Sequence, residues 1–179
     1  EWNNLNNAYF RGHADKKWEI KPSLFRNNNL IYEHELLKKA QNTLWFELQN
    51  TKTHLERLII LQHHGLSTRL LDVTTNPLIA LYFACLDNKN DKGEETDGVV
   101  YCGYYNDGSF NNNNIEKICE FINDKQPDEI CSTLPKIVLK EEVNEDLLTK
   151  SHFIHPPCNN KRIITQSGAF LLPPLYEKS

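Results

Sequence analysis

Long apolar runs and an excess of basic charge are both missing from this chain. None of its apolar runs reaches the roughly 18 residues that a membrane-spanning helix needs. The formal net charge is -4 at pH 7, so no global positive field attracts nucleic acid. No signal peptide is recognisable in the sequence. We therefore expect a cytoplasmic protein without a membrane partner.

The spacing of the cysteines excludes the common cysteine motifs. The chain has five cysteines, which is an odd number, and no CxxC pair. They are Cys85, Cys102, Cys119, Cys131 and Cys158. No two of them have the close spacing of a zinc-binding loop, and an odd, scattered set does not resemble a disulfide framework. We expect reduced thiols and no bound metal.

Methionine is absent, and arginine is rare. Because the chain begins at Glu1 and contains no methionine, we expect it to be a fragment of a longer protein. Lysine dominates the basic residues, and only five are arginine: Arg11, Arg26, Arg57, Arg69 and Arg162. A chain that uses lysine by default keeps arginine where a planar, bidentate guanidinium is needed. For Arg57, an ordinary salt bridge is a better explanation than a need for bidentate binding.

The pattern of apolar residues predicts an α+β fold. Apolar side chains recur at helical spacing early in the chain, and β-branched and aromatic runs come later. We expect helices at about 31–49, 53–63, 78–86 and 115–123, and strands at 8–10, 98–105, 135–140, 153–155 and 162–172, the last interrupted at 166–168. Without a βαβ repeat, the N-terminal helices should pack on a mostly antiparallel sheet of late strands. We expect one domain over residues 1–179.

Local signals mark the ends of two of these helices. Gly65 is suited to end the helix at 53–63, because glycine readily adopts the left-handed conformation that follows many helices. Asn76 and Pro77 suit the N-cap and the first position of the next helix. The segment Leu78–Leu86 is apolar on nearly every side, which predicts a central, buried helix whose aromatic residues belong to the core.

The segment Gln62–Asp72 concentrates polar groups between two apolar stretches. It contains two histidines, a glycine, two hydroxyl groups, an arginine and an aspartate, and it lies between Leu58–Leu61 and Pro77–Cys85. Polar and charged side chains are costly to bury unless they are paired. The residues alone allow two interpretations: a buried hydrogen-bond network that organises the core, or the floor of a binding or catalytic site.

Three sequence blocks stand out: Tyr9–His13 with Trp18 and Pro22–Leu24; Gln62–Asp72 with Asn76–Ala84; and Arg162–Phe170. Together they resemble the FRG domain, a mostly bacterial and phage family named for its Phe-Arg-Gly motif. The blocks extend over nearly the whole chain in the family's order, and the central block is the most specific. Ser67 departs from the family, which usually has proline there. The change relaxes the loop without removing a reactive group.

The same blocks resemble, more distantly, the layout of ADP-ribosyltransferases. In that fold a first strand carries an Arg or His that holds the cofactor, a second motif supplies a hydroxyl or aromatic group near the nicotinamide, and a late strand carries a catalytic Glu. The resemblance implies NAD as the substrate, with Arg11 matching the first element, Thr68 the second and Gln166 the third. The catalytic candidates are Arg11, Thr68, Gln166 and His64, and the cofactor-binding candidates are Arg11, Gly12, His13, His63, Thr68, Arg69 and Asp72.

The chemistry of ADP-ribose transfer suits some of these residues. The reaction breaks a glycosidic bond through a transition state that resembles an oxocarbenium ion, so an enzyme must hold the cofactor and stabilise positive charge. Arg11 suits the holding role because a guanidinium binds phosphate or ribose oxygens bidentately, and Gly12 would let a ligand approach the backbone. Arg11 could instead be held by Asp72 or by a carbonyl group. Arg69 could bind phosphate or pair with Asp72.

A catalytic carboxylate is missing from the late block. Gln166 can orient a hydroxyl or an amide, but it cannot act as a general base or supply negative charge. The residues that follow it are serine, glycine and alanine. Glu141, Glu142 and Glu177 are available elsewhere in the chain. Asp72 suits a structural ion pair better than catalysis.

These observations favour an ADP-ribosyltransferase-like enzyme or NAD glycohydrolase, of the kind used as a bacterial toxin or phage-defence effector, with an unknown macromolecular target. The alternative is a non-catalytic sensor that binds a nucleotide or NAD-derived ligand. A phosphodiesterase that uses His63 or His64 with Arg69 fits less well, because adjacent histidines point in different directions. A structural module, in which the motifs only organise the core, is the fourth interpretation.

Overall fold

A computed structural model of the chain describes residues 8–26, 29–90, 92–104, 112–124, 148–156 and 161–175. These residues form the predicted α+β structure. They belong to two compact units. The first unit takes the described residues of Glu1–Ile20, Asp72–Phe110 and Phe153–Leu171, and the second takes those of Lys21–Leu71, Asn111–His152 and Leu172–Ser179. Strands dominate the first unit and helices the second.

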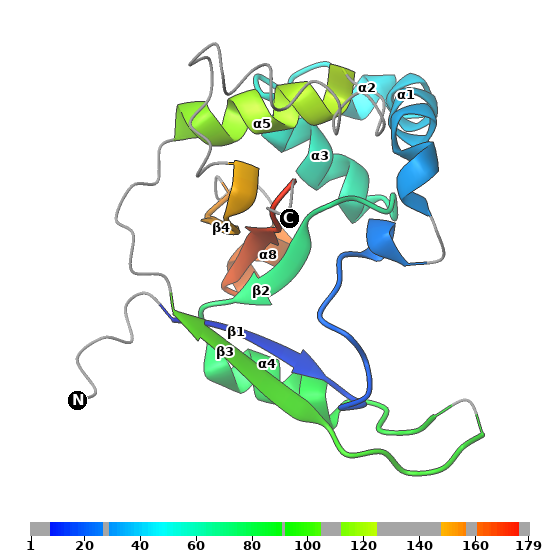
Figure 1. Cartoon of the computed structure of the whole chain (residues 1–179), viewed down its shortest axis with the longest axis vertical. Coiled ribbons are helices and arrows are strands. Elements are labelled where there is room, and N and C mark those ends of the chain that lie inside the picture. Colours follow the sequence, from blue (N-terminus) through cyan, green and yellow to red (C-terminus); the bar gives the residue numbers. More distant parts are fainter. Residues whose placement is uncertain are drawn as a thin grey trace. The chain divides into compact units, whose positions relative to one another are not determined.

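The described part of the first unit is built on a five-stranded sheet (Figure 1). Its strands are β1 (Ala8–His13), β2 (Leu71–Thr74), β3 (Val99–Tyr104), β4 (His152–Ile154) and β5 (Gly168–Leu172), in the spatial order β3-β1-β2-β5-β4. β1 pairs antiparallel with both of its neighbours, as the fold class predicts. Early strands contribute as well as late ones, because β1 and β2 both lie within the first half of the chain.

The two sides of β1 are paired to very different extents. Toward β3 the ladder runs along the whole strand, from Ala8 to His13. Toward β2 the register contains the single pair Phe10–Thr74. Beyond that pair the two backbones no longer form a ladder. The sheet therefore opens between β1 and β2, directly beside Arg11.

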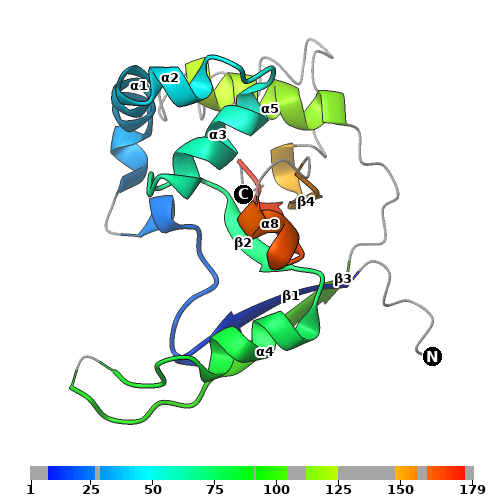
Figure 2. The ribbon, with the colours of Figure 1, turned by 180° about the vertical axis from the view of Figure 1, so that it is seen from behind.

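Helix α4 (Pro77–Cys85) begins as the sequence predicts, but it is not buried. The side-chain oxygen of Asn76 accepts the backbone N–H of Leu78 at 3.0 Å and caps the helix. The helix packs on β1 and β3, and Figure 2 shows it lying along them. Only its two alanines are buried, whereas Leu78 and Tyr82 are 71% and 60% exposed. The prediction of a central, buried helix is wrong, because the sheet covers only the alanine side of α4.

Two glycines let α4 approach the sheet closely. A Cβ atom on Gly12 would lie 1.8 Å from the carbonyl oxygen of Ala80, and a Cβ atom on Gly98 would lie 1.9 Å from the carbonyl oxygen of Ala84. Protein interiors are too tightly packed to absorb such overlaps, so any larger residue would push the helix off the strands. The glycine of the Phe-Arg-Gly motif therefore has a packing role.

The described part of the second unit is helical. It contains η2 (Ser23–Phe25), η3 (Asn29–Tyr32), α1 (Glu33–Thr43), α2 (Trp45–Leu48), α3 (His54–His63) and α5 (Asn112–Asp124). The helix expected at 31–49 is divided, because the backbone leaves the α conformation at Leu44. α3 and α5 are confirmed. Thr53 caps α3 by accepting the N–H of Glu56 at 3.1 Å, and Gly65 follows its end with a φ of +92°.

Other sequence expectations change or lie outside the described residues. The segment expected as a strand at 162–172 is a helix, α8 (Lys161–Thr165), followed by β5, and the expected interruption is the turn between them. β2 was not expected, because four residues are too few to show a period-two pattern. The strand expected at 153–155 is β4, whereas the strand expected at 135–140 lies outside the described residues.

Candidate functional site

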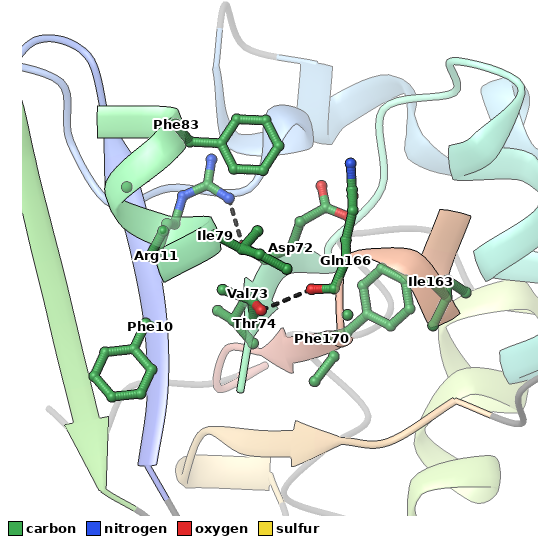
Figure 3. A pocket seen from close by; sticks show the side chains of 14 residues that line it. Phe10, Arg11, Asp72, Val73, Thr74, Ile79, Phe83, Ile163, Gln166 and Phe170 are labelled. Atoms are coloured by element: carbon green, nitrogen blue, oxygen red, sulfur yellow. Dashed lines mark hydrogen bonds between the residues drawn. The ribbon is translucent and has the colours of Figure 1, made fainter. Parts of the chain in front are cut away.

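A cavity of about 230 Å³ lies in the first unit beside the opening between β1 and β2 (Figure 3). It is lined by Phe10, Arg11 and Gly12 of β1; Asp72, Val73 and Thr74 of β2; Ile79, Ala80 and Phe83 of α4; and Ile163, Gln166, Gly168, Ala169 and Phe170 of the α8–β5 segment. Sites for drug-sized ligands are usually roughly 300–1,000 Å³. This cavity therefore suits a small ligand or one part of a larger one.

Three predicted site residues bring charged or amide groups to this cavity. They are Arg11, Asp72 and Gln166, and Figure 3 shows the ends of their side chains directed toward the same side of it. Apolar side chains, including Ile79 and Phe83, form much of the remaining wall. A few convergent polar groups in an apolar cavity are typical of a binding site.

The side chain of Arg11 spans the opening between β1 and β2. Its Nη1 donates to the backbone oxygen of Asp72 at 2.5 Å, and its Nε donates to Nε2 of His13 at 2.8 Å. The contact with a carbonyl group, which was one of the two structural alternatives, is therefore present. Because a guanidinium is planar, two hydrogen bonds to different acceptors fix its orientation. The Arg11 side chain therefore lines the cavity in a fixed orientation.

His13 supports Arg11 from within the structure. Its side chain is 3% exposed, and it is not among the residues that line the cavity. Nε2 accepts the Arg11 N–H, so that nitrogen carries no proton, and Nδ1 lies 3.2 Å from the backbone oxygen of Trp18. This network assigns a neutral ring with its proton on Nδ1. The predicted cofactor-binding residue is thus placed where it orients the guanidinium.

Asp72 provides a carboxylate that the late sequence block lacks. It is the one exposed residue of β2, whose other members are buried. Its side chain lines the cavity while its backbone oxygen holds Arg11. Among the residues that the structure describes, none forms a hydrogen bond with the carboxylate oxygens of Asp72. The carboxylate is therefore available to a ligand in the cavity.

A tight turn after α8 carries Gln166 to the cavity. Ser167 has a φ of +46°, a left-handed conformation that costs an L-residue roughly 1–2 kcal/mol, and it redirects the chain into β5. The Ser167 carbonyl oxygen accepts the N–H of Thr75 at 3.0 Å, and the Thr74 hydroxyl donates to the carbonyl oxygen of Gln166 at 2.7 Å (Figure 3). These bonds tie the turn to the end of β2, so Gln166 and Asp72 are positioned together.

The other polar candidates belong to the second unit. They are His63, His64, Thr68 and Arg69. The hydroxyl of Thr68 donates to Oε1 of Gln62 at 2.5 Å and accepts the N–H of Leu70 at 3.1 Å. The two histidines are exposed, and their rings meet edge to face with centroids 5.6 Å apart. Thr68 therefore takes part in a buried network, one of the two interpretations of the central block.

Arg69 is engaged by a carboxylate from α1. Its Nε donates to both oxygens of Glu33, at 2.8 and 3.0 Å, and its Nη2 donates to Oε2 at 2.6 Å. Both side chains are about 95% buried, at 5% and 4% exposure. The guanidinium also lies 5.7 Å from the ring centroid of Phe25. The alternative that paired Arg69 with Asp72 is wrong, because its carboxylate partner is Glu33. No local sequence signal identifies Glu33 as that partner.

Residues 6–93 match the FRG domain family. The chain carries an FRG domain. The matched segment, just under half of the chain, contains β1, the polar block Gln62–Asp72 and α4, whereas the block at Arg162–Phe170 lies beyond it. No curated protein and no solved structure matches the chain significantly. The resemblance to ADP-ribosyltransferases and the extension of one domain over residues 1–179 stay predictions.

The FRG domain supplies three of the four walls of the cavity, and the α8–β5 segment supplies the fourth.

In the part of the chain that the structure describes, no three His, Cys, Asp or Glu side chains are grouped to hold a metal ion. No helix within the described ranges is long and apolar enough to cross a membrane. Cys85, Cys102 and Cys119 are free thiols, and burial raises the pKa of the Cys119 thiol.

Proposed function

We propose that the cavity binds NAD and that the protein is an ADP-ribosyltransferase-like enzyme or an NAD glycohydrolase. The observation that supports this most is the convergence of the Arg11 guanidinium and the Asp72 carboxylate on one cavity, with Gln166 on a third wall. A cation binds phosphate or ribose oxygens, a carboxylate stabilises developing positive charge, and an amide can pair with the nicotinamide carboxamide. The cavity volume suits the nicotinamide-ribose part of NAD, with the remainder extending outward.

The reaction would divide its tasks among these groups. Arg11, held by His13, binds the ribose or pyrophosphate. The glycosidic C–N bond breaks, its electron pair leaves with nicotinamide, and the Asp72 carboxylate stabilises the oxocarbenium character at the ribose carbon. Water or a nucleophile of a macromolecular target then attacks that carbon and loses a proton. Consumption of NAD or modification of a target would make the protein a toxin or phage-defence effector.

Calorimetric titration with NAD, run in parallel with a nicotinamide-release assay, tests the proposal. Wild type should bind NAD and release nicotinamide. Arg11→Ala should lose both activities, because the cation is removed. Asp72→Asn should bind NAD with little change but release nicotinamide about 100-fold more slowly, as when one preorganised electrostatic group is lost. Lys16→Ala is the matched control, since Lys16 is an exposed cation of the same unit that pairs with Asp97 at 2.7 Å.

A sensor that binds NAD or a related nucleotide without turnover is the second candidate. It is favoured by Gln166, because the resemblance implies a catalytic Glu near this position and a glutamine cannot supply negative charge. Binding by wild type without any nicotinamide release would support the sensor. If folded wild type neither binds NAD nor releases nicotinamide, both forms of the NAD proposal are refuted. Other nucleotides would then be screened against the same Arg11 variant.

A further inference from the structure

The outer side of α4 and the neighbouring strand β3 carry large apolar side chains that are open to solvent. We call this set the α4–β3 surface; it consists of Leu78, Leu81, Tyr82, Leu86, Val100 and Tyr104. Their exposed fractions run from 37% to 71%. Single exposed apolar residues are ordinary, but a contiguous patch indicates an interaction site.

The two parts of the α4–β3 surface are continuous because they face the same way. α4 packs on β3, and a Cβ atom on Gly98 would point at the backbone of α4. Side chains alternate along a strand, so Val100 and Tyr104 lie on the α4 side of the sheet with Gly98. Gly103 faces the opposite side, where a Cβ atom would meet the ring of Phe153 at 3.4 Å. The strand residues therefore extend the apolar side of the helix.

The composition of this surface favours an identical partner. Neither Pro77–Leu86 nor Val99–Tyr104 contains a charged residue. A two-fold interface brings the same patch from both copies together, and an uncharged patch meets its copy without like-charge repulsion. β3 is also at the end of the described strand order, so no described strand pairs with its outer edge. An exposed edge strand is a ready template for pairing with another chain.

We propose that the α4–β3 surface is the interface of a homodimer. The exposed parts of its side chains amount to about three whole large residues, or roughly 500 Å² per copy at the areas typical of such side chains. Backbone and the exposed Cys85 and Cys102 on the same segments add to this area. A standard stable interface buries about 800 Å² per partner. Two copies would together bury about 1,000 Å², which is the lower end of the range for a biological interface and smaller than the standard size. The surface is independent of the proposed NAD chemistry.

Sedimentation velocity over a range of protein concentrations measures the association state. Wild type should show a species of twice the 20.9 kDa chain mass, in increasing proportion as concentration rises. The Tyr82→Lys variant and the Leu78→Lys, Tyr82→Lys double variant should each raise the dissociation constant of the dimer at least tenfold. The reason is that each introduced lysine would be buried opposite its copy. Phe46→Lys is the matched control, since Phe46 is 64% exposed in the second unit.

Circular dichroism of each variant separates lost association from lost folding. Tyr82 and Leu78 are exposed within the chain, so their lysine variants should keep the wild-type spectrum. A monomeric wild type at every concentration overturns the proposal. A dimer that survives the Leu78→Lys, Tyr82→Lys double variant also overturns it, because the interface would then lie elsewhere. Dissociation by the α4 variants with a dimeric Phe46→Lys control supports it.

Discussion

The Glu33–Arg69 pair allows a sharp test of whether Arg69 is a structural residue or a ligand-binding one. Three hydrogen bonds between 2.6 and 3.0 Å join the two side chains, which are 5% exposed or less. Arg69→Met keeps a long unbranched side chain but leaves the Glu33 carboxylate buried without its cation. Breaking a buried pair in this way costs about 3–5 kcal/mol, which is a large part of the roughly 5–15 kcal/mol that stabilises most proteins.

Urea unfolding followed by circular dichroism measures this cost, and a double-mutant cycle assigns it to the pair. Glu33→Leu alone should also destabilise, because it leaves the guanidinium buried and unpaired. The double variant should recover most of the loss, since replacing both members of a buried ion pair with apolar residues is often neutral. The stability loss of the double variant should be smaller than the summed losses of the two single variants by about 2 kcal/mol or more. Such a coupling energy is expected for residues in direct contact.

Ligand binding by Arg69→Met is the second measurement that separates the two roles of Arg69. NAD binding by the folded variant should equal that of wild type, because Arg69 is engaged by Glu33 and is not among the residues that line the cavity. A stability loss below about 1 kcal/mol, the range of exposed pairs, together with lost NAD binding would refute the structural role and favour the phosphate-binding alternative.

Two further changes test packing and titration in the first unit. Gly12→Ala should destabilise the protein by about 3 kcal/mol or more in urea unfolding, because its Cβ would overlap the Ala80 carbonyl oxygen at 1.8 Å. Gly103→Ala is the control, since a Cβ atom there would make only ordinary van der Waals contact. Equal losses of stability in the two variants would contradict the packing role of Gly12. Burial lowers the pKa of His155, whose Nε2 lies 2.6 Å from the Tyr9 hydroxyl, so the folded state binds this proton less well than the unfolded state. The stability that the neutral His155 contributes is therefore present above the unfolded pKa of about 6.5 and is lost as pH falls below it. Wild type should lose more stability between pH 7 and pH 5 than His155→Gln. Identical pH profiles of the two proteins would show that His155 does not contribute.

Features set by neighbouring residues were predictable from the sequence. The ends of α3 follow from a Thr53 side chain that caps its own helix and from Gly65 just beyond it. Likewise, Asn76 caps α4 two residues along the chain. The strand β3 follows from its β-branched and aromatic composition. Such signals act within one turn or one strand, so they can be read before any tertiary contact is known.

Part of the candidate site was also predictable, but its composition was not. Arg11 and Gln166 were chosen as site residues from motifs, and both line the cavity. Asp72 was expected to act in an ion pair, yet the opening between β1 and β2 places its carboxylate in the cavity. His13 was expected to bind the cofactor, and its position behind Arg11 depends on a hydrogen bond to Trp18. No alternation of apolar residues encodes those arrangements.

The sequence by itself determined the α+β class, most of the helix and strand positions, and the match of residues 6–93 to the FRG domain family, because these depend on local pattern and motif. Only the tertiary structure decided which groups meet. Arg69 binds a carboxylate 36 residues away, and Arg11 reaches the backbone of a strand 61 residues away. The single ladder pair between β1 and β2 opens the cavity, and the glycine contacts with α4 leave its outer side apolar and exposed. Long-range partners are chosen by packing and hydrogen-bond satisfaction across the whole fold, which no local window of sequence contains.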